Sequence, residues 1–311
     1  MKKFSEKITI IGSGAAGYTA AIYCARSNMK PLVLAGLQPG GQLTITTDVE
    51  NFPGFSDVIQ GPWLMEQMQR QAENVGARVL FDLVTEISQV ENHFVLKCDS
   101  GNEIKSESII IATGAQARWL GLESEKKFNG KGVSACATCD GFFYKQKEVA
   151  VVGGGNTAVE EALYLSNICS KVTLIHRRNE LRAAKILQDR LFKNPKVTVI
   201  WNNRVKEILG DEMGVNSLLL ENVLSKETLS VSLNGLFVAI GHDPATSIFK
   251  GKIELDEQDY IKVDKGTTRT SVPGIFAAGD CVDKIYRQAV TAAGMGCMAA
   301  LDAEKWLAAK N

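Results

Sequence analysis

The chain has 311 residues, enough for about two domains that each have their own hydrophobic core. Its 35 lysines and arginines balance its 35 aspartates and glutamates, so no net charge attracts nucleic acid or an anionic membrane. A hydrophobic fraction of 45% with 28 glycines is typical of an α/β enzyme and excludes a disordered or fibrous protein. We therefore expect neither a nucleic-acid partner nor, since apolar runs are short, a membrane span.

The first predicted element is a buried parallel strand at Ile8–Ile11, which leads through the pattern G-x-G-x-x-G into a helix at Tyr18–Ser27. In this setting Gly12 permits a tight turn, Gly14 lets a pyrophosphate approach the backbone, and Gly17 lets the helix pack on the strand. The start of the helix also offers free N–H groups to phosphates. The pattern predicts a dinucleotide site.

The chain up to residue 114 continues this first domain. Its second strand ends in Leu32–Gly36 without the acidic residue that commonly holds the ribose hydroxyls, so the dinucleotide must be held by other means. Turn chemistry alone favours surface loops at Pro39–Leu43 and Val49–Gly54. An amphipathic helix is predicted at residues 62–75, and a buried strand runs through Ser108–Gly114 into a turn of small residues.

Two cysteines separated by two residues, Cys136 and Cys139, are followed directly by Asp140. Such a pair can close into a small disulfide, and the carboxyl can carry a proton to or from a sulfur. Zinc is a weaker alternative, because the other five cysteines stand singly and the three histidines are scattered. Nothing marks the chain as exported, and an odd number of seven cysteines suits a reducing cytoplasm. We predict a redox-active pair in a cytoplasmic protein, without a metal site.

A second cycle of strand, glycines and helix comes after the cysteine pair. A strand at Glu148–Val152 enters Gly153–Ala158, a G-x-G-x-x-A variant that the fingerprint allows, and a helix is predicted next at Val159–Ser166. The residues expected to line this second dinucleotide site are Gly153, Gly155, Asn156 and Thr157.

The strand Lys171–Ile175 then delivers His176, Arg177 and Arg178 about twenty residues past the glycines. A carboxylate at this place selects NAD, whereas arginines accept the 2′-phosphate of NADP through charge-assisted bonds. We expect Arg182 to lie one helical turn beyond Arg178, where it can join them. A solvated basic helix start is the alternative, but the position after a fingerprint favours an NADP site.

A third apolar run, Gly274–Asp280, lies beyond the second cycle and is expected to rejoin the first domain. The predicted fold is therefore α/β, with two Rossmann-like domains of which the second is inserted into the first. We expect domain one to comprise residues 1–117 and 245–311 and domain two residues 118–244, linked by a double-stranded hinge. The final helix, Gln288–Ala308, has partial positive charge at its start.

With these motifs in view, the chain resembles bacterial-type, low-molecular-weight thioredoxin reductase. The resemblance covers nearly the whole chain and rests on GSGAAG, GGQL, ENFPG, ATGA, CATCD, GGGNTA, HRR, AIGH, AAGD and YRQA in this order. It implies a homodimer whose glutathione-reductase-like, three-layer domains bind FAD and NADPH. Electrons are expected to pass from NADPH to FAD, to the Cys136–Cys139 pair and then to thioredoxin. A related flavin-dependent NADPH reductase with another redox partner is the alternative.

The resemblance also implies residue roles. Cys139 is expected to face the flavin, Cys136 to attack the partner disulfide, and Asp140 to act as acid–base. Because the dithiol and the nicotinamide site share one domain, they are expected to take turns at the flavin by rotation about the hinge. The residues expected to line the FAD site are Gly12, Gly14, Ala15, Gly17, Gly36, Gly41, Gln42, Leu43, Asn51, Ala112, Gly114, Gly279, Asp280, Arg287, Gln288 and Ala289.

Overall fold

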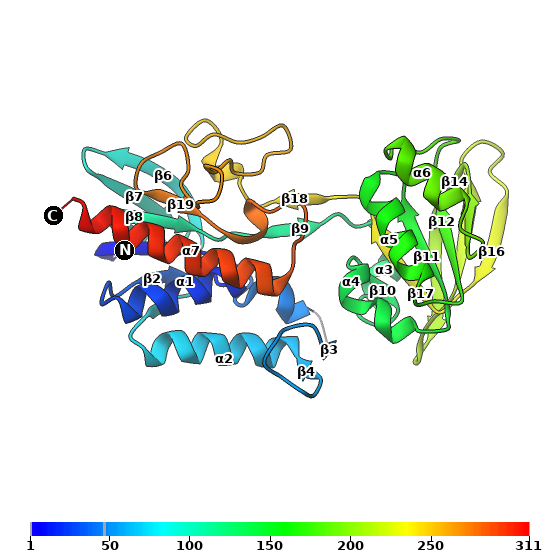
Figure 1. The fold of residues 1–311 in the computed structure, drawn as a ribbon, viewed down its shortest axis with the longest axis horizontal. Coiled ribbons are helices and arrows are strands. Elements are labelled where there is room, and N and C mark those ends of the chain that lie inside the picture. The colour runs from blue at the N-terminus through cyan, green and yellow to red at the C-terminus, as the bar shows by residue number, and fades with distance from the viewer. Residues whose placement is uncertain (1, 46–47, 311) are drawn as a thin grey trace. The chain divides into compact units, whose positions relative to one another are not determined.

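The computed structural model describes residues 2–45 and 48–310, which fold as two compact units (Figure 1). Unit 1 combines the chain up to Gln116 with the chain from Asp243 onward, and unit 2 is Ala117–His242. Two short strands, β9 (Ala115–Ala117) and β18 (His242–Pro244), pair with each other where the chain passes between the units. Residues 117 and 244, near which the chain is expected to cross between the domains, belong to these two strands.

Unit 1 is built on a seven-stranded sheet with the order β5-β2-β1-β8-β7-β6, in which β19 also pairs with β8. Strands β5, β2, β1, β8 and β19 run parallel, whereas β7 and β6 continue the sheet as an antiparallel meander. The strands are β1 (Lys3–Ile11), β2 (Leu32–Leu34), β5 (Arg78–Leu80), β6 (Val84–Val90), β7 (His93–Cys98), β8 (Glu103–Ile111) and β19 (Ile275–Ala277), with a separate hairpin of β3 (Asp48–Val49) and β4 (Ile59–Gln60).

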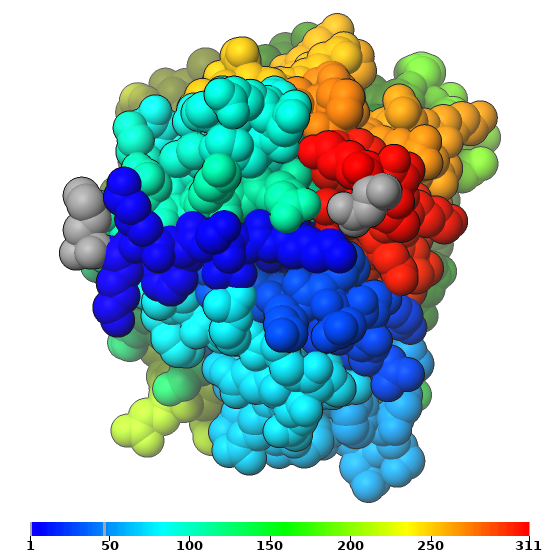
Figure 2. Space-filling model, turned by 90° about the vertical axis from the view of Figure 1, so that its left-hand side faces the viewer, coloured from blue at the N-terminus to red at the C-terminus, as the bar shows by residue number. Residues whose placement is uncertain are grey.

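Helices α1 (Ala15–Arg26), α2 (Gly61–Asn74) and α7 (Ala289–Ala308) cover one face of this sheet (Figure 1). Successive strand residues point to opposite faces, so Ile110 packs in the core under the helices and Ile111 in the core on the other face. Figure 2 shows the start of the chain (blue) beside the C-terminal helix (red), so both chain ends complete the same unit.

Unit 2 repeats this plan with a five-stranded parallel sheet of order β10-β17-β11-β12-β13. Its strands are β10 (Val133–Ser134), β11 (Glu148–Gly153), β12 (Lys171–Ile175), β13 (Val197–Ile200) and β17 (Gly235–Ala239). One core joins a sheet face to α4 (Ala137–Asp140), α5 (Asn156–Ser166) and α6 (Lys185–Phe192). A second core joins the other face to α3 (Glu123–Phe128) and the antiparallel sheet of β14 (Asn203–Asp211), β15 (Gly214–Asn222) and β16 (Thr228–Ser232).

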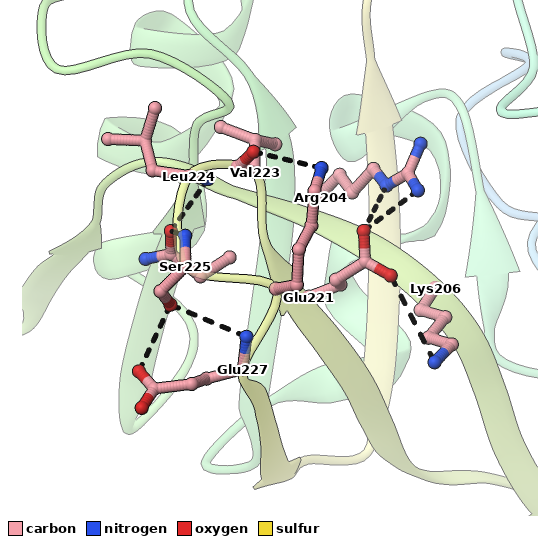
Figure 3. Close-up of polar contacts among 9 residues, drawn as sticks. Arg204, Lys206, Glu221, Val223, Leu224, Ser225 and Glu227 are labelled. Atoms are coloured by element: carbon pink, nitrogen blue, oxygen red, sulfur yellow. Dashed lines mark hydrogen bonds and ion pairs between the residues drawn. The ribbon is translucent and has the colours of Figure 1, made fainter.

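A charged cross-strand pair marks the antiparallel sheet of unit 2 (Figure 3). Arg204 lies opposite Glu221 and donates to its Oε1 from Nε at 3.1 Å and from Nη2 at 2.8 Å. The ammonium of Lys206 is 4.0 Å from the other carboxylate oxygen. Exposed ion pairs contribute at most about 1 kcal/mol, so this cluster favours the register of β14 and β15 more than the stability of the unit.

The predicted elements agree closely with the observed ones. The strand predicted at Lys171–Ile175 is β12 with the same bounds, and the final helix is α7, one residue shorter at its start. The helix starts differ more: α1 begins at Ala15 and α5 at Asn156, three residues earlier than predicted, because the last fingerprint residues already form the first helical turn. No helix in the described part of the chain is both long and apolar enough to cross a membrane.

Candidate active site

The Cys136–Cys139 pair is closed as a disulfide, with the two Cα atoms 5.3 Å apart. Cys136 is the N-cap of α4, and its Sγ accepts a hydrogen bond from the Cys139 N–H at 3.2 Å. Ser134, a buried residue at the end of β10, accepts from the Cys136 N–H at 3.0 Å. The end of a strand and the start of a helix therefore hold both sulfurs in one short turn. Sequence reasoning did not single out Ser134.

The groups around the disulfide differ in what they can do with a proton. Cys139 is exposed, and Cys136 and Asp140 are half-buried. Burial raises the pKa of nearby Tyr144 to about 12, and the Asp140 carboxylate adds to this effect. The phenol of Tyr144 therefore keeps its proton at neutral pH.

The other cysteines lack the features of a reactive pair. Burial raises the pKa of Cys24 and of Cys98 to about 12, so both thiols stay protonated. The five cysteines outside the pair are free: Cys24, Cys98, Cys169, Cys281 and Cys297. Within residues 2–45 and 48–310, no three His, Cys, Asp or Glu side chains lie together in a way that could hold a metal ion.

In unit 1 the first fingerprint leaves no room for a side chain at Gly12 or Gly17 but leaves space at Gly14. A Cβ on Gly12, whose φ is +109°, would lie 2.2 Å from the carbonyl oxygen of Ala112, and a Cβ on Gly17 would lie 2.1 Å from that of Gly12. Nothing lies within 4 Å of the place of a Cβ on Gly14, the N-cap of α1, and no side chain caps this helix. The open backbone at Gly14 fits a bound pyrophosphate.

Ser13 joins the fingerprint to two further segments of unit 1. Its hydroxyl donates to the carbonyl of Ala35, at the end of β2, at 2.9 Å and accepts from the N–H of Gly40 at 3.1 Å. A Cβ on Gly41, whose φ is +66°, would lie 3.3 Å from the Cα of Gly14. The structure thus brings the GGQL loop against the fingerprint. Ser13 could have been noticed in the sequence as the one hydroxyl in the motif.

The AAGD and YRQA segments also come together in unit 1. Burial raises the pKa of Asp280 to about 6, with Asp283 acting in the same direction and Arg287 against it. The carboxylate of Asp283 accepts from the backbone N–H of Arg287 at 3.1 Å, which fixes the turn before α7. Gln288 is the N-cap of α7, and its Oε1 accepts from the side chain of Asn51 at 3.5 Å.

In unit 2 the second fingerprint has the same open position. Nothing lies within 4 Å of the place of a Cβ on Gly155, the N-cap of α5, which again lacks a side-chain cap. A Cβ on Gly153 would lie 2.3 Å from the carbonyl oxygen of Ala239 and 2.5 Å from the Cβ of Ala158. The backbone at Gly155 therefore fits a second pyrophosphate.

His176 is a buried part of this turn. Its ring fills the space beside Gly154, where a Cβ would meet it at 2.2 Å, and its Nδ1 is 2.9 Å from the carbonyl oxygen of Gly153. Since a carbonyl only accepts, Nδ1 carries a proton. Burial lowers the pKa of His176, and the charges of Arg182 and Arg178 act in the same direction. The neutral ring braces the glycine turn.

The three arginines lie on an irregular loop between β12 and α6, where Arg177, Arg178 and Arg182 are all exposed. The expectation that Arg182 lies one helical turn beyond Arg178 is wrong, because α6 begins only at Lys185. The side chain of Asn156, at the start of α5, holds the end of this loop, because its Oδ1 accepts a hydrogen bond from the N–H of Ala184 at 2.8 Å.

Comparison with known proteins gives full-length matches. A family model described as pyridine nucleotide-disulphide oxidoreductase matches residues 6–296. Thioredoxin reductase from Rickettsia felis is 59% identical over 307 residues, covering 98% of this chain and 99% of that protein. Its counterpart from Escherichia coli O157:H7 is 53% identical over 310 residues, covering 97% and 96%.

Solved structures give the same result. The structure of thioredoxin reductase from Giardia duodenalis is 45% identical, with a TM-score of 0.94 and coverage of 98% of this chain and 99% of that one. That from Streptococcus pyogenes is 41% identical, with a TM-score of 0.93 and the same coverage. These matches confirm the predicted fold class of two Rossmann-like domains.

Proposed function

The chain belongs to the pyridine nucleotide-disulphide oxidoreductase family, among the bacterial-type thioredoxin reductases, and we propose that it reduces thioredoxin with NADPH, using bound FAD and its own disulfide. The observation that carries this proposal is the Cys136–Cys139 disulfide beside Asp140, in a chain with two open fingerprint turns. FAD, when bound, accepts a hydride from a nicotinamide and can deliver two electrons to a disulfide.

Unit 1 is proposed to bind FAD. The open backbone at Gly14 supports this assignment, because two packed glycines flank it and the GGQL loop lies against it. The carboxyl of Asp280 belongs to this unit and can form a hydrogen bond with a polar group of a bound cofactor. The residues that we propose to line the site remain Gly12, Gly14, Ala15, Gly17, Gly36, Gly41, Gln42, Leu43, Asn51, Ala112, Gly114, Gly279, Asp280, Arg287, Gln288 and Ala289.

Unit 2 is proposed to bind NADPH. Gly155 offers open backbone for the pyrophosphate, and three exposed arginines come after β12 at the place where a fingerprint site recognises the ribose. Guanidinium groups pair with a 2′-phosphate through forked, charge-assisted bonds, which NADH cannot form. The residues proposed for this site are Gly153, Gly155, Asn156, Thr157, His176, Arg177, Arg178 and Arg182.

The thiol chemistry is proposed to proceed by disulfide exchange. Two electrons and one proton convert the pair to a thiolate on Cys136 and a thiol on Cys139, and the N–H bonded to Cys136 Sγ favours the thiolate. Cys136 attacks one thioredoxin sulfur, and the other sulfur leaves as a thiolate. Asp140 then takes the proton from Cys139, which attacks Cys136 in the mixed disulfide. Asp140 passes this proton to one of the two thioredoxin thiolates that have left, and the other thiolate takes its proton from water. The attack of Cys139 restores the Cys136–Cys139 bond and releases reduced thioredoxin.

We also propose that two copies associate through α7. From Ala289 to Leu301 this helix has no charged residue, yet Met298 is 41% exposed and Leu301 42%. A helix that is apolar all round is normally covered on every side, and a second copy would cover it here. Sedimentation should show a dimer that Met298→Glu converts to a monomer, and an unchanged dimer in this variant would rule the face out.

The proposed compartment is the cytoplasm. Five free cysteines beside one redox pair are consistent with surroundings that keep thiols reduced.

The proposed function is tested by replacing the attacking sulfur. Cys136→Ser should leave NADPH able to bleach the flavin but should abolish NADPH consumption with oxidised thioredoxin. Cys98→Ser is the matched control, because Cys98 is a buried free cysteine of β7 without an assigned role. Thioredoxin turnover that survives in Cys136→Ser would contradict the proposal.

A further inference from the structure

The loop that carries the three arginines is fixed at both ends by hydrogen bonds to its backbone. Near its start, the carbonyl of Arg178 accepts from the N–H of Asn202 at 3.2 Å. Near its end, the N–H of Arg182 donates to the carbonyl of Gly154 at 2.7 Å. The position of Arg182 therefore depends on the contacts that hold this end segment.

Gln188, a half-buried residue of α6, provides such a contact. Its Nε2 donates to the carbonyl of Ala183 at 2.7 Å and, at 3.4 Å, to that of Leu181. The side chains of Leu181 and Ala183 are buried, whereas Arg182 between them is exposed. One amide group thus holds the backbone on both sides of this arginine. The side chain of Asn156, in α5, binds the N–H of Ala184, the residue after Ala183.

We propose that Gln188 is a positioning residue that sets the preference for a 2′-phosphorylated nucleotide by holding Arg182. This inference rests on the proposed NADPH site. A forked guanidinium bond is directional, so an arginine on a backbone already held in place loses less conformational freedom on binding. Gln188 acts on the 2′-phosphate through Arg182 and does not contact the nucleotide.

A purely structural role for Gln188 predicts a different outcome. If its amide only stabilised α6, its loss would not distinguish nucleotides with a 2′-phosphate from nucleotides without one. If it positions Arg182, its loss weakens only nucleotides that carry the 2′-phosphate. The two roles separate in a binding measurement that needs no turnover.

The test measures calorimetric binding of adenosine 2′,5′-bisphosphate and of 5′-AMP to the flavin-loaded protein. Gln188→Met keeps the length of the side chain and removes the donor. It should weaken the bisphosphate by about 3- to 10-fold, as expected for the loss of one hydrogen-bonding group, and 5′-AMP by less than about 2-fold. Ile186→Met, at an exposed position of the same helix, is the matched control and should change neither.

A double-variant cycle keeps the inference open to refutation if Gln188→Met also lowers stability. In an Arg182→Ala background, Gln188→Met should cost no further preference for the bisphosphate. Additive losses, or equal weakening of both ligands, would overturn the role of Gln188 alone. A wild-type protein that binds the bisphosphate no better than 5′-AMP would overturn the NADPH site as well.

Discussion

Each unit has a glycine fingerprint at the start of a helix, but the packing behind the glycines differs between the two units. Gly17 and Ala158 occupy the same third position of α1 and α5. A methyl group at Gly17 would lie 2.1 Å from the carbonyl oxygen of Gly12, whereas unit 2 accommodates the methyl of Ala158. Both helices leave their N-cap glycine open. The open N-cap is therefore the feature that the two sites share, and the packing behind it is set separately in each unit.

The units also differ in the segment that comes after the second strand of each fingerprint. In unit 1 the chain after β2 turns back to Ser13 through Ala35 and Gly40, with no charged side chain in that turn. In unit 2 the chain after β12 presents Arg177 and Arg178 to solvent. We infer that unit 1 holds its ligand by backbone contacts and buried polar groups, whereas unit 2 adds recognition of an anion.

The packing difference gives the largest expected effect. Gly17→Ala should lower the free energy of unfolding by about 3 kcal/mol or more and reduce flavin content, because backbone must move to admit the methyl. The reciprocal change, Ala158→Gly, should cost about 1 kcal/mol, the usual penalty of glycine in a helix. Denaturant unfolding and flavin absorbance check both, and equal losses would show that the two turns pack alike.

The charge difference gives the next largest effect. Arg177→Ala combined with Arg178→Ala should raise the KM for NADPH by about 100-fold, since each charge-assisted bond contributes about 1.5–3 kcal/mol. The KM for NADH should stay within about 3-fold of the wild-type value. Steady-state kinetics with thioredoxin measure both, and parallel losses would show that these arginines do not recognise the 2′-phosphate.

Each unit also buries one titratable side chain near its fingerprint. In unit 2 burial lowers the pKa of His176 and keeps the ring neutral, and in unit 1 burial raises the pKa of Asp280 to about 6. The unfolded chain loses this proton at a lower pH than the folded one, so Asp280 makes the flavin-free protein less stable as pH rises from about 4 to 6. Asp280→Asn should remove roughly 3 kcal/mol of this loss. Unfolding curves that keep the same pH dependence in the variant would contradict it.

Much of the fold was predictable because buried parallel strands are continuous apolar runs in the sequence. The strand Lys171–Ile175 was located to the residue, and both fingerprints had the strand and helix that they require. The antiparallel layer of β14, β15 and β16 was not predicted, since register shifts interrupt the alternation between core and solvent along β14 and β15. The separation into two units could be inferred from the repeat of the glycine pattern.

The candidate sites were predictable as motifs and not as contacts. The motifs are held in place by the side chains of Ser13, Ser134 and Gln188. No motif specifies these three residues, and their contacts form only on folding. The helical spacing expected between Arg178 and Arg182 failed for a related reason. The chain from His176 to Ala184 is irregular and α6 begins only at Lys185, so the spacing of a helical turn does not apply to these two arginines.

The central claim is that NADPH electrons reach both a flavin and the Cys136–Cys139 disulfide of this chain. Anaerobic titration with NADPH, following flavin absorbance and free-thiol content together, tests it most directly. We expect each subunit to take up two electron pairs, one that bleaches the flavin and one that releases two new thiols, which Cys136→Ser does not release. Uptake of one pair without any gain in thiols in the wild-type protein would contradict this claim.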